Sequence, residues 1–183
     1  MSGDLHTIVA LVEDRPGVLN RVSSLFRRRG FNISSLAVGK SEQPNLSRMT
    51  FVVKGNQEIV ERVTKQLNKL IDVIKVTQFE EAHVVTRELA LIKTKATADK
   101  RGEIMQIVDI FRANIVDVGS QSLVIEATGE EEKIDALYNL LVPFGVLEIM
   151  RTGRIAMTRS QWSHGEELNR IQKNGSKKTP QVN

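Results

Sequence analysis

The sequence repeats one pattern of apolar spacing twice, and this repeat constrains the fold more than any other feature. In both halves an apolar, β-branched segment precedes a helical apolar stripe, two further strands, a second helical stripe and a last strand. Gly17 precedes Phe26 by nine residues, and Gly102 precedes Phe111 by nine. We therefore predict an internal structural duplication with its boundary near residues 80–85.

The first half predicts the element order βαββαβ from the periods of its apolar residues. The expected strands are residues 5–12, 31–39, 47–54 and 72–79; the first helix carries Val18, Leu19, Val22, Leu25 and Phe26 on one stripe, and the second carries Ile59, Val60, Val63, Leu67 and Leu70. Pro16 suits a first helical turn, and Gly30 suits the left-handed position that ends a helix. Asn56 suits the cap of the second helix.

The second half predicts the same order. The expected strands are residues 87–96, 114–119, 122–129 and 146–157, and the helical stripes are Ile104, Ile107, Val108 and Phe111, then Ile134, Leu137 and Leu141. The two copies differ at their helix ends, where "EDRPG" becomes "ADKRG" and "RRRGFNIS" shortens to "RANIVD". We therefore expect the first copy to bind a ligand and the second to act as a scaffold. The polar residues 160–183 are expected to form a disordered basic tail.

Composition narrows the class of protein. The chain has no cysteine, which removes disulfides, thiolate metal sites and cysteine nucleophiles and fits a reducing compartment. No apolar run approaches the ~20 residues needed to span a bilayer, so we expect a soluble, cytoplasmic protein without a membrane partner. Residues 159–183 hold three of the four net positive charges. The body is therefore almost neutral, which argues against a broad phosphate-binding face for nucleic acid.

No arrangement of residues predicts catalysis. His6, His83 and His164 lie far apart in the sequence, and none has a second histidine at metal-ligand spacing. The nucleophile-elbow, zinc-protease, P-loop and dinucleotide-binding motifs are all missing from the sequence. We therefore expect neither a catalytic residue nor a metal site or cofactor in this chain, and an enzymatic alternative would require turnover by the purified chain alone.

The ends of the first helix suit a free amino acid. The turn from Asp14 to Val18 can offer unpaired backbone N–H groups to a carboxylate, and Gly17 lets a ligand approach the backbone closely. Asp14 could hold the ammonium group, and the amide of Asn32 can both donate and accept. The two helix ends lie about 20 Å apart at 1.5 Å per residue, so two copies of the chain would have to build one site. From the residues alone a second interpretation stays open, in which these residues only start and end a helix.

Several stretches of the chain resemble one family. They are "EDRPGVLNRVSSLFRRRGFNISSLAVG", "LSRMTFVVKG", "KQLNKLIDVIKV", "RELALIKTKA", "IFRANIVDVGSQSLVIEATG" and "RTGRIAMTR". Together they resemble the regulatory small subunit of acetohydroxyacid synthase, also called acetolactate synthase, over residues 5–159. This resemblance is more specific than the D-x-P-G-V-L turn, which occurs in many ACT domains.

The resemblance implies an α+β fold of two tandem ferredoxin-like βαββαβ units. Residues 1–80 would be an ACT domain for effector binding and dimerisation, and residues 81–159 a related C-terminal domain. It implies a homodimer that binds valine at the ACT interface, activates the catalytic large subunit in branched-chain amino acid biosynthesis and makes it sensitive to valine feedback inhibition. Thiamine diphosphate, Mg²⁺ and FAD would belong to that catalytic partner.

The effector-binding residues that the resemblance implies lie at the two ends of the first helix. They are Asp14, Pro16, Gly17, Val18 and Leu19 from the helix start, with Asn32 and Ile33 from the neighbouring subunit. Asp14 stands where the family often has asparagine. An RNA-binding module remains as an alternative from another class, because ferredoxin-like sheets also serve that role. Against it, strand "SRMTFVVKG" offers Phe51 as its only aromatic residue.

Overall fold

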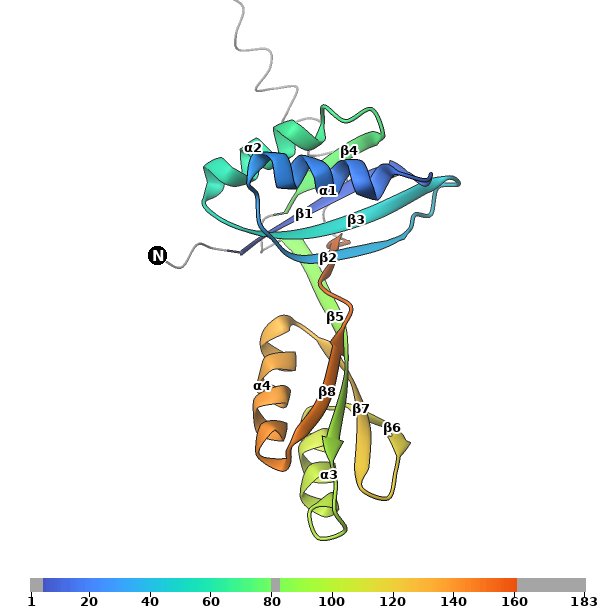
Figure 1. Ribbon diagram of the computed structural model, residues 1–183, viewed down its shortest axis with the longest axis vertical. Helices are drawn as coiled ribbons and strands as arrows, with labels where there is room; N and C mark the ends of the chain where they lie inside the picture. The colour runs from blue at the N-terminus through green and yellow to red at the C-terminus, as the bar shows by residue number, and fades with distance from the viewer. Residues whose placement is uncertain (1–4, 80–82, 161–183) are drawn as a thin grey trace, which may run out of the picture.

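The computed structural model describes residues 5–79 and 83–160, and these form two α+β units (Figure 1). The N-terminal unit contains β1 (Leu5–Glu13), α1 (Val18–Arg29), β2 (Ile33–Lys40), β3 (Leu46–Lys54), α2 (Gln57–Leu67) and β4 (Val73–Gln78). Its strands form an antiparallel sheet in the order β2-β3-β1-β4, with β2 and β4 at the edges.

The C-terminal unit repeats this arrangement. It contains β5 (Val84–Lys95), α3 (Arg101–Ile110), β6 (Asn114–Val118), β7 (Ser122–Gly129), α4 (Glu131–Leu141), the short 3₁₀ helix η2 (Val142–Phe144), β8 (Val146–Arg151) and β9 (Ile155–Thr158). The sheet order is β6-β7-β5-β8, and β9 pairs with β5. The predicted α+β fold of two tandem βαββαβ units is confirmed. Beyond residue 160 the predicted tail lies outside the described residues.

The ends of the helices follow local sequence signals. Gly30 ends α1 with a φ of 67°, as predicted, and its N–H bonds back to the last turn. Asn56 caps α2, where its side chain accepts a hydrogen bond from the N–H of Ile59 at 3.0 Å. The prediction for Pro16 was wrong by two residues. Pro16 lies in the preceding turn, because Gly17 takes a φ of 90° and α1 begins at Val18.

Each unit has its own apolar core between its helices and its sheet. In the first core the ring of Phe26 stacks on Phe51 with centroids 5.2 Å apart, and it meets Phe31 edge-on at 6.1 Å. The second core is built from fully buried aliphatic side chains, among them Ile92 and Leu137. Each such buried side chain contributes about 1.5–3 kcal/mol relative to exposure.

One member of the predicted stripe of α1 does not reach the core. Leu19 is 46% exposed, whereas Val18, Val22, Leu25 and Phe26 are buried. Leu19 follows Val18 by one residue and is therefore rotated about 100° from it around the helix axis. The buried face is narrower than predicted, and an apolar side chain is left exposed beside Gly17.

The predicted last strand over residues 146–157 is interrupted. It forms β8 and β9, separated by Thr152, Gly153 and Arg154, because Gly153 takes a φ of 79° that an extended strand does not accommodate. β9 then pairs with the first part of β5, so β5 begins at Val84 rather than at residue 87 as predicted. The break in the strand lies where the two units meet.

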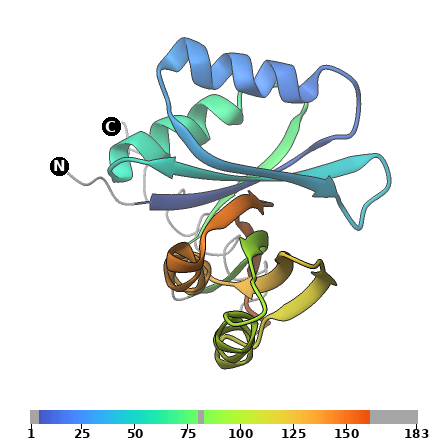
Figure 2. The ribbon, with the colours of Figure 1, turned by 60° about the horizontal axis from the view of Figure 1, so that its bottom comes forward.

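The N-terminal sheet separates its own helices from the C-terminal unit. Figures 1 and 2 show α1 and α2 on one face of this sheet and the C-terminal unit on the other. The alternation along β1 agrees with this arrangement. Ile8 belongs to the core under the helices, whereas its neighbour Thr7 is contacted by Arg154 from the C-terminal unit.

Candidate functional site

The start of α1 is an open helix end. Gly17 occupies the N-cap position, and no described side chain forms a cap hydrogen bond there. The first N–H groups of an α-helix have no intrahelical acceptor, so this turn can donate to an anion such as a carboxylate. A Cβ built on Gly17 would have a single close neighbour among the described atoms, the guanidinium of Arg21 at 3.7 Å. The turn is therefore accessible to a small ligand.

A buried carboxylate that sequence reasoning missed holds this turn in place. Asp72 lies just before β4, is 1% exposed and accepts a hydrogen bond from Arg15. Its other oxygen lies 3.1 Å from the guanidinium of Arg21 but accepts no hydrogen bond. The signal in the sequence was one acid within the apolar stretch "LIDVIKV"; Asp72 is the first residue of the strand expected over 72–79 and lies just outside β4.

The charges around this turn nearly balance, with one carboxylate, that of Asp14, in excess. Arg15 also contacts Glu13 at 2.5 Å, so two guanidiniums face two carboxylates. Asp14 lies on the exposed side of the loop, and its backbone N–H donates to the carbonyl of Asn45 at 2.8 Å. A ligand here would therefore be recognised by directed donors and acceptors rather than by a strong net charge.

The remaining predicted residues lie at the opposite end of the sheet. The 12 residues of α1 give a length of about 18 Å, and Asn32 and Ile33 follow its far end. Asn32 is exposed and Ile33 half-buried, at the start of the edge strand β2. One chain therefore brings Asp14, Gly17 and Leu19 together and keeps Asn32 apart from them.

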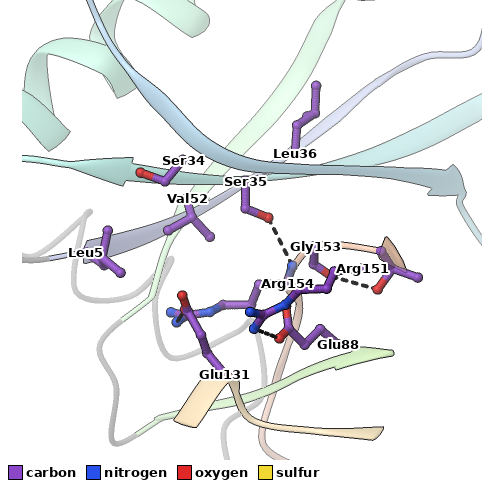
Figure 3. Close-up of a pocket in the computed structure, with 11 residues that line it drawn as sticks. Leu5, Ser34, Ser35, Leu36, Val52, Glu88, Glu131, Arg151, Gly153 and Arg154 are labelled. Carbon is purple, nitrogen blue, oxygen red and sulfur yellow. Dashed lines mark hydrogen bonds and ion pairs between the residues drawn. The ribbon is translucent and has the colours of Figure 1, made fainter. Parts of the chain in front are cut away.

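A pocket lies between the two units (Figure 3). It is a pocket of about 340 Å³ lined by Leu5, Ser34, Ser35, Leu36 and Val52 from the first unit and by Glu88, Glu131, Arg151, Thr152, Gly153 and Arg154 from the second. Figure 3 shows the side chain of Leu36 pointing away from the pocket, so this residue lines it with its backbone. The pocket was not predicted, because its two walls are distant in the sequence.

The charged side chains of this pocket are engaged with one another. Arg151 donates to Glu88, which is buried, and to Asp135 at 2.6 Å. Burial alone would lower the pKa of Arg151, but these hydrogen bonds outweigh it and raise the pKa above its ordinary value. Arg154 pairs with Glu131 at 2.6 Å. The pocket is electrically balanced, and its ion pairs connect elements of the fold.

Other classes of site find little support in the described residues. Within residues 5–79 and 83–160, no group of three or more His, Asp or Glu side chains could hold a metal ion. Among the same residues, no helix is both long enough and apolar enough to cross a membrane. Phe51, which the RNA-binding alternative needs as an exposed stacking platform, is fully buried against Phe26.

Two family models match the chain, one for each unit. The model described as "AHAS small subunit-like ACT domain" matches residues 8–75. The model described as "Small subunit of acetolactate synthase" matches residues 87–160. The two matches follow the two sheets of the structure.

Curated relatives and a solved structure are similar to the chain over most of its length. It is 56% identical over 154 residues to the acetolactate synthase small subunit of Mycolicibacterium smegmatis, covering 84% of this chain and 91% of the relative. It is 55% identical to the probable acetolactate synthase small subunit of Archaeoglobus fulgidus, covering 84% and 96%. The crystal structure of the small subunit from Thermotoga maritima matches with a TM-score of 0.81 and 46% identity, covering 87% of this chain and 99% of the other.

Proposed function

The chain belongs to the family of acetolactate synthase small subunits, and we propose that it regulates a catalytic large subunit by sensing valine. The main support is the similarity to small subunits over most of both chains. On this proposal the chain is non-catalytic and works in the cytoplasm in branched-chain amino acid biosynthesis. It activates the large subunit, which carries thiamine diphosphate, Mg²⁺ and FAD, and makes that subunit sensitive to feedback inhibition.

The effector site we propose lies between two copies of the ACT domain. The open helix start at Gly17 and Val18 would donate N–H groups to the valine carboxylate, with Asp14 accepting from its ammonium group. Leu19 is exposed beside them and would contact the isopropyl group. Asn32 and Ile33 would come from the second copy, since α1 separates them from Gly17 by about 18 Å within one chain.

The homodimer that this site requires is supported by the edge strand β2. It has one neighbour, β3, in the sheet order, and it carries Val38, which is half exposed. An edge strand with free N–H and C=O groups can pair with a second chain. A site shared by two copies would couple ligand binding to the arrangement of the subunits.

The proposal is tested by titrating the purified full chain with valine, leucine and isoleucine in a calorimeter. Asn32→Ala should abolish the heat, because it removes the amide contributed by the second copy. Gly17→Ala should weaken binding by about tenfold or more, since its methyl group would lie where the ligand approaches the helix start. Gly145→Ala is the matched control, because Gly145 also has a left-handed φ, of 96°, but lies in the C-terminal unit.

A pull-down with the thiamine-dependent large subunit tests the partner. Acetolactate formation by the reconstituted complex should rise relative to the large subunit alone and should fall when valine is added. A chain that binds none of the three amino acids at millimolar concentration would contradict the effector assignment. A chain that fails to bind the large subunit would contradict the regulatory role itself.

A further inference from the structure

Arg154 contacts three elements from two units at once. Its backbone N–H donates to the hydroxyl of Ser35 on β2 at 3.1 Å. Its guanidinium donates to the hydroxyl of Thr7 on β1 at 3.2 Å and pairs with Glu131, the first residue of α4, at 2.6 Å. We call Gly153 and Arg154 together the interdomain clip. Figure 3 shows the clip beneath β2, with the dashed bond to Ser35.

Gly153 brings the backbone of the clip against β2. A Cβ at this position would lie 2.5 Å from the hydroxyl of Ser35 and 3.5 Å from the carbonyl oxygen of Leu36. The hydroxyl of Ser35 therefore lies against the backbone of Gly153 and accepts a hydrogen bond from the N–H of Arg154. A displacement of Ser35 by even an ångström breaks this hydrogen bond or forces the clip to move with it.

Ser35 lies two residues after Ile33, and the proposed function assigns Asn32 and Ile33, but not Ser35, to the effector site. The pairing of β2 with β3 shifts register between Ile33 and Ser35, as at a β-bulge. A bulge leaves an unpaired residue and disrupts the ladder locally, so the strand can adjust there more easily than in a regular ladder. Few ladder hydrogen bonds hold β2 between Ile33 and Ser35. A movement of Asn32 and Ile33 toward a ligand would therefore move Ser35 as well.

On the other side, the clip is covalently joined to the elements that organise the C-terminal unit. Arg154 directly precedes β9, which pairs with β5, and Arg151 precedes Gly153 at the end of β8. Arg154 also fixes the start of α4 through Glu131. A shift of the clip therefore changes the position of both a strand and a helix in the C-terminal unit.

We propose that Arg154 and Ser35 are positioning residues that transmit effector binding at β2 to the C-terminal unit. This inference rests on the proposed function, because it needs an effector that engages Asn32 and Ile33. The charged groups of the interdomain pocket already pair with one another, so the pocket works as a junction between the units. Binding and response are separable in such an arrangement, because the clip contacts no residue of the effector site itself.

The experiment uses the full chain reconstituted with the large subunit. Arg154→Ala removes the contacts with Thr7 and Glu131, and Ser35→Ala removes the acceptor of the backbone N–H. Each variant should bind valine with an affinity within about threefold of the unmodified chain, while the valine-dependent change in acetolactate formation falls by about fivefold or more. Ser35→Thr keeps the hydroxyl and should restore the response. The control is Arg87→Ala, which removes an exposed ion pair with Glu130 in the same unit.

Hydrogen exchange gives a readout that does not depend on activity. In the unmodified chain valine should slow amide exchange in β2 and also in β9, whereas in Arg154→Ala the change should stop at β2. A normal valine response of both Arg154→Ala and Ser35→Ala would overturn the inference. Loss of valine binding in both variants would also overturn it, because they would then be damaging the effector site. If the unmodified chain binds no valine, the proposed function fails first and this inference fails with it.

Discussion

Replacing Gly153 with alanine tests how closely the two units approach each other, because the substitution should change the free energy of unfolding. Gly153 and Gly30 both have left-handed backbones, with φ of 79° and 67°. A non-glycine residue in that region costs about 1–2 kcal/mol, offset in part by about 0.4–1 kcal/mol from the restricted unfolded chain. A Cβ on Gly30 meets no described atom within 4 Å. Gly30→Ala should therefore destabilise the protein by about 1 kcal/mol through backbone strain alone.

Gly153→Ala carries the same strain and a steric conflict in addition. Its Cβ would lie 2.5 Å from the hydroxyl oxygen of Ser35, so this hydroxyl must rotate away and release the N–H of Arg154. Loss of one such hydrogen bond costs about 0.5–1.5 kcal/mol. We expect Gly153→Ala to destabilise the protein by about 1 kcal/mol more than Gly30→Ala.

Urea unfolding and thermal unfolding measure the difference. For a chain of this size, 1 kcal/mol corresponds to about 2–4 °C in the midpoint. In a Ser35→Ala background the conflicting oxygen is gone, so Gly153→Ala should then cost no more than Gly30→Ala, giving a coupling of about 1 kcal/mol. Equal effects of the two glycine substitutions in the unmodified chain would refute the close approach of Gly153 to β2, and so would a coupling near zero.

Two further predictions concern charged side chains of the N-terminal unit. Hydrogen bonds from Arg48 hold the pKa of Glu42 at about 2. Because this pKa is lowered on folding, its stabilisation is present above pH 4.5 and is lost as the pH falls toward 2. In Arg48→Ala, NMR titration should find the pKa of Glu42 raised clearly above 2, while the hydrogen bonds from the backbone and from Ser41 keep it below 4.5; a value still near 2 would contradict the assigned cause. Asp72→Asn leaves Arg21 without its anionic partner and Arg15 with Glu13 alone, and it should lower the free energy of unfolding by about 1–3 kcal/mol in urea. Asp14→Asn, on the exposed side of the same loop, should change it by less than about 0.5 kcal/mol, and equal effects would show that Asp72 is not the residue that holds the turn.

The secondary structure could be predicted because its signals are local. Val22, Leu25 and Phe26 recur at the helical period, and Asn56 and Gly30 cap helices through contacts within four residues of themselves. Leu19 shows the limit of that method. An apolar residue at the margin of a stripe can be buried or exposed, and the width of the covering sheet decides which.

The interdomain contacts could not be predicted, because they join residues that no local pattern relates. Arg154 lies 119 positions from Ser35 and 147 from Thr7. Within the strand expected over residues 146–157, nothing but Gly153 indicated a break. The separation of Gly17 from Asn32, in contrast, follows from helix rise alone, and the 12-residue α1 agrees with it.

The two copies of the duplicated fold differ at the start of their first helix. Gly102 lies inside α3 rather than at its cap and has no left-handed φ, unlike Gly17. Arg101, the first residue of α3, donates to the carbonyl oxygens of Gly119 at 2.8 Å and Ser120 at 3.1 Å, so its guanidinium fastens the β6-β7 turn to the helix start. In the first unit the corresponding turn contains the exposed Gly17, and the buried carboxylate of Asp72 holds this turn through Arg15. A helix start beside the chain's own guanidinium has less room for a ligand, so this difference agrees with the proposal that places the effector site in the first unit.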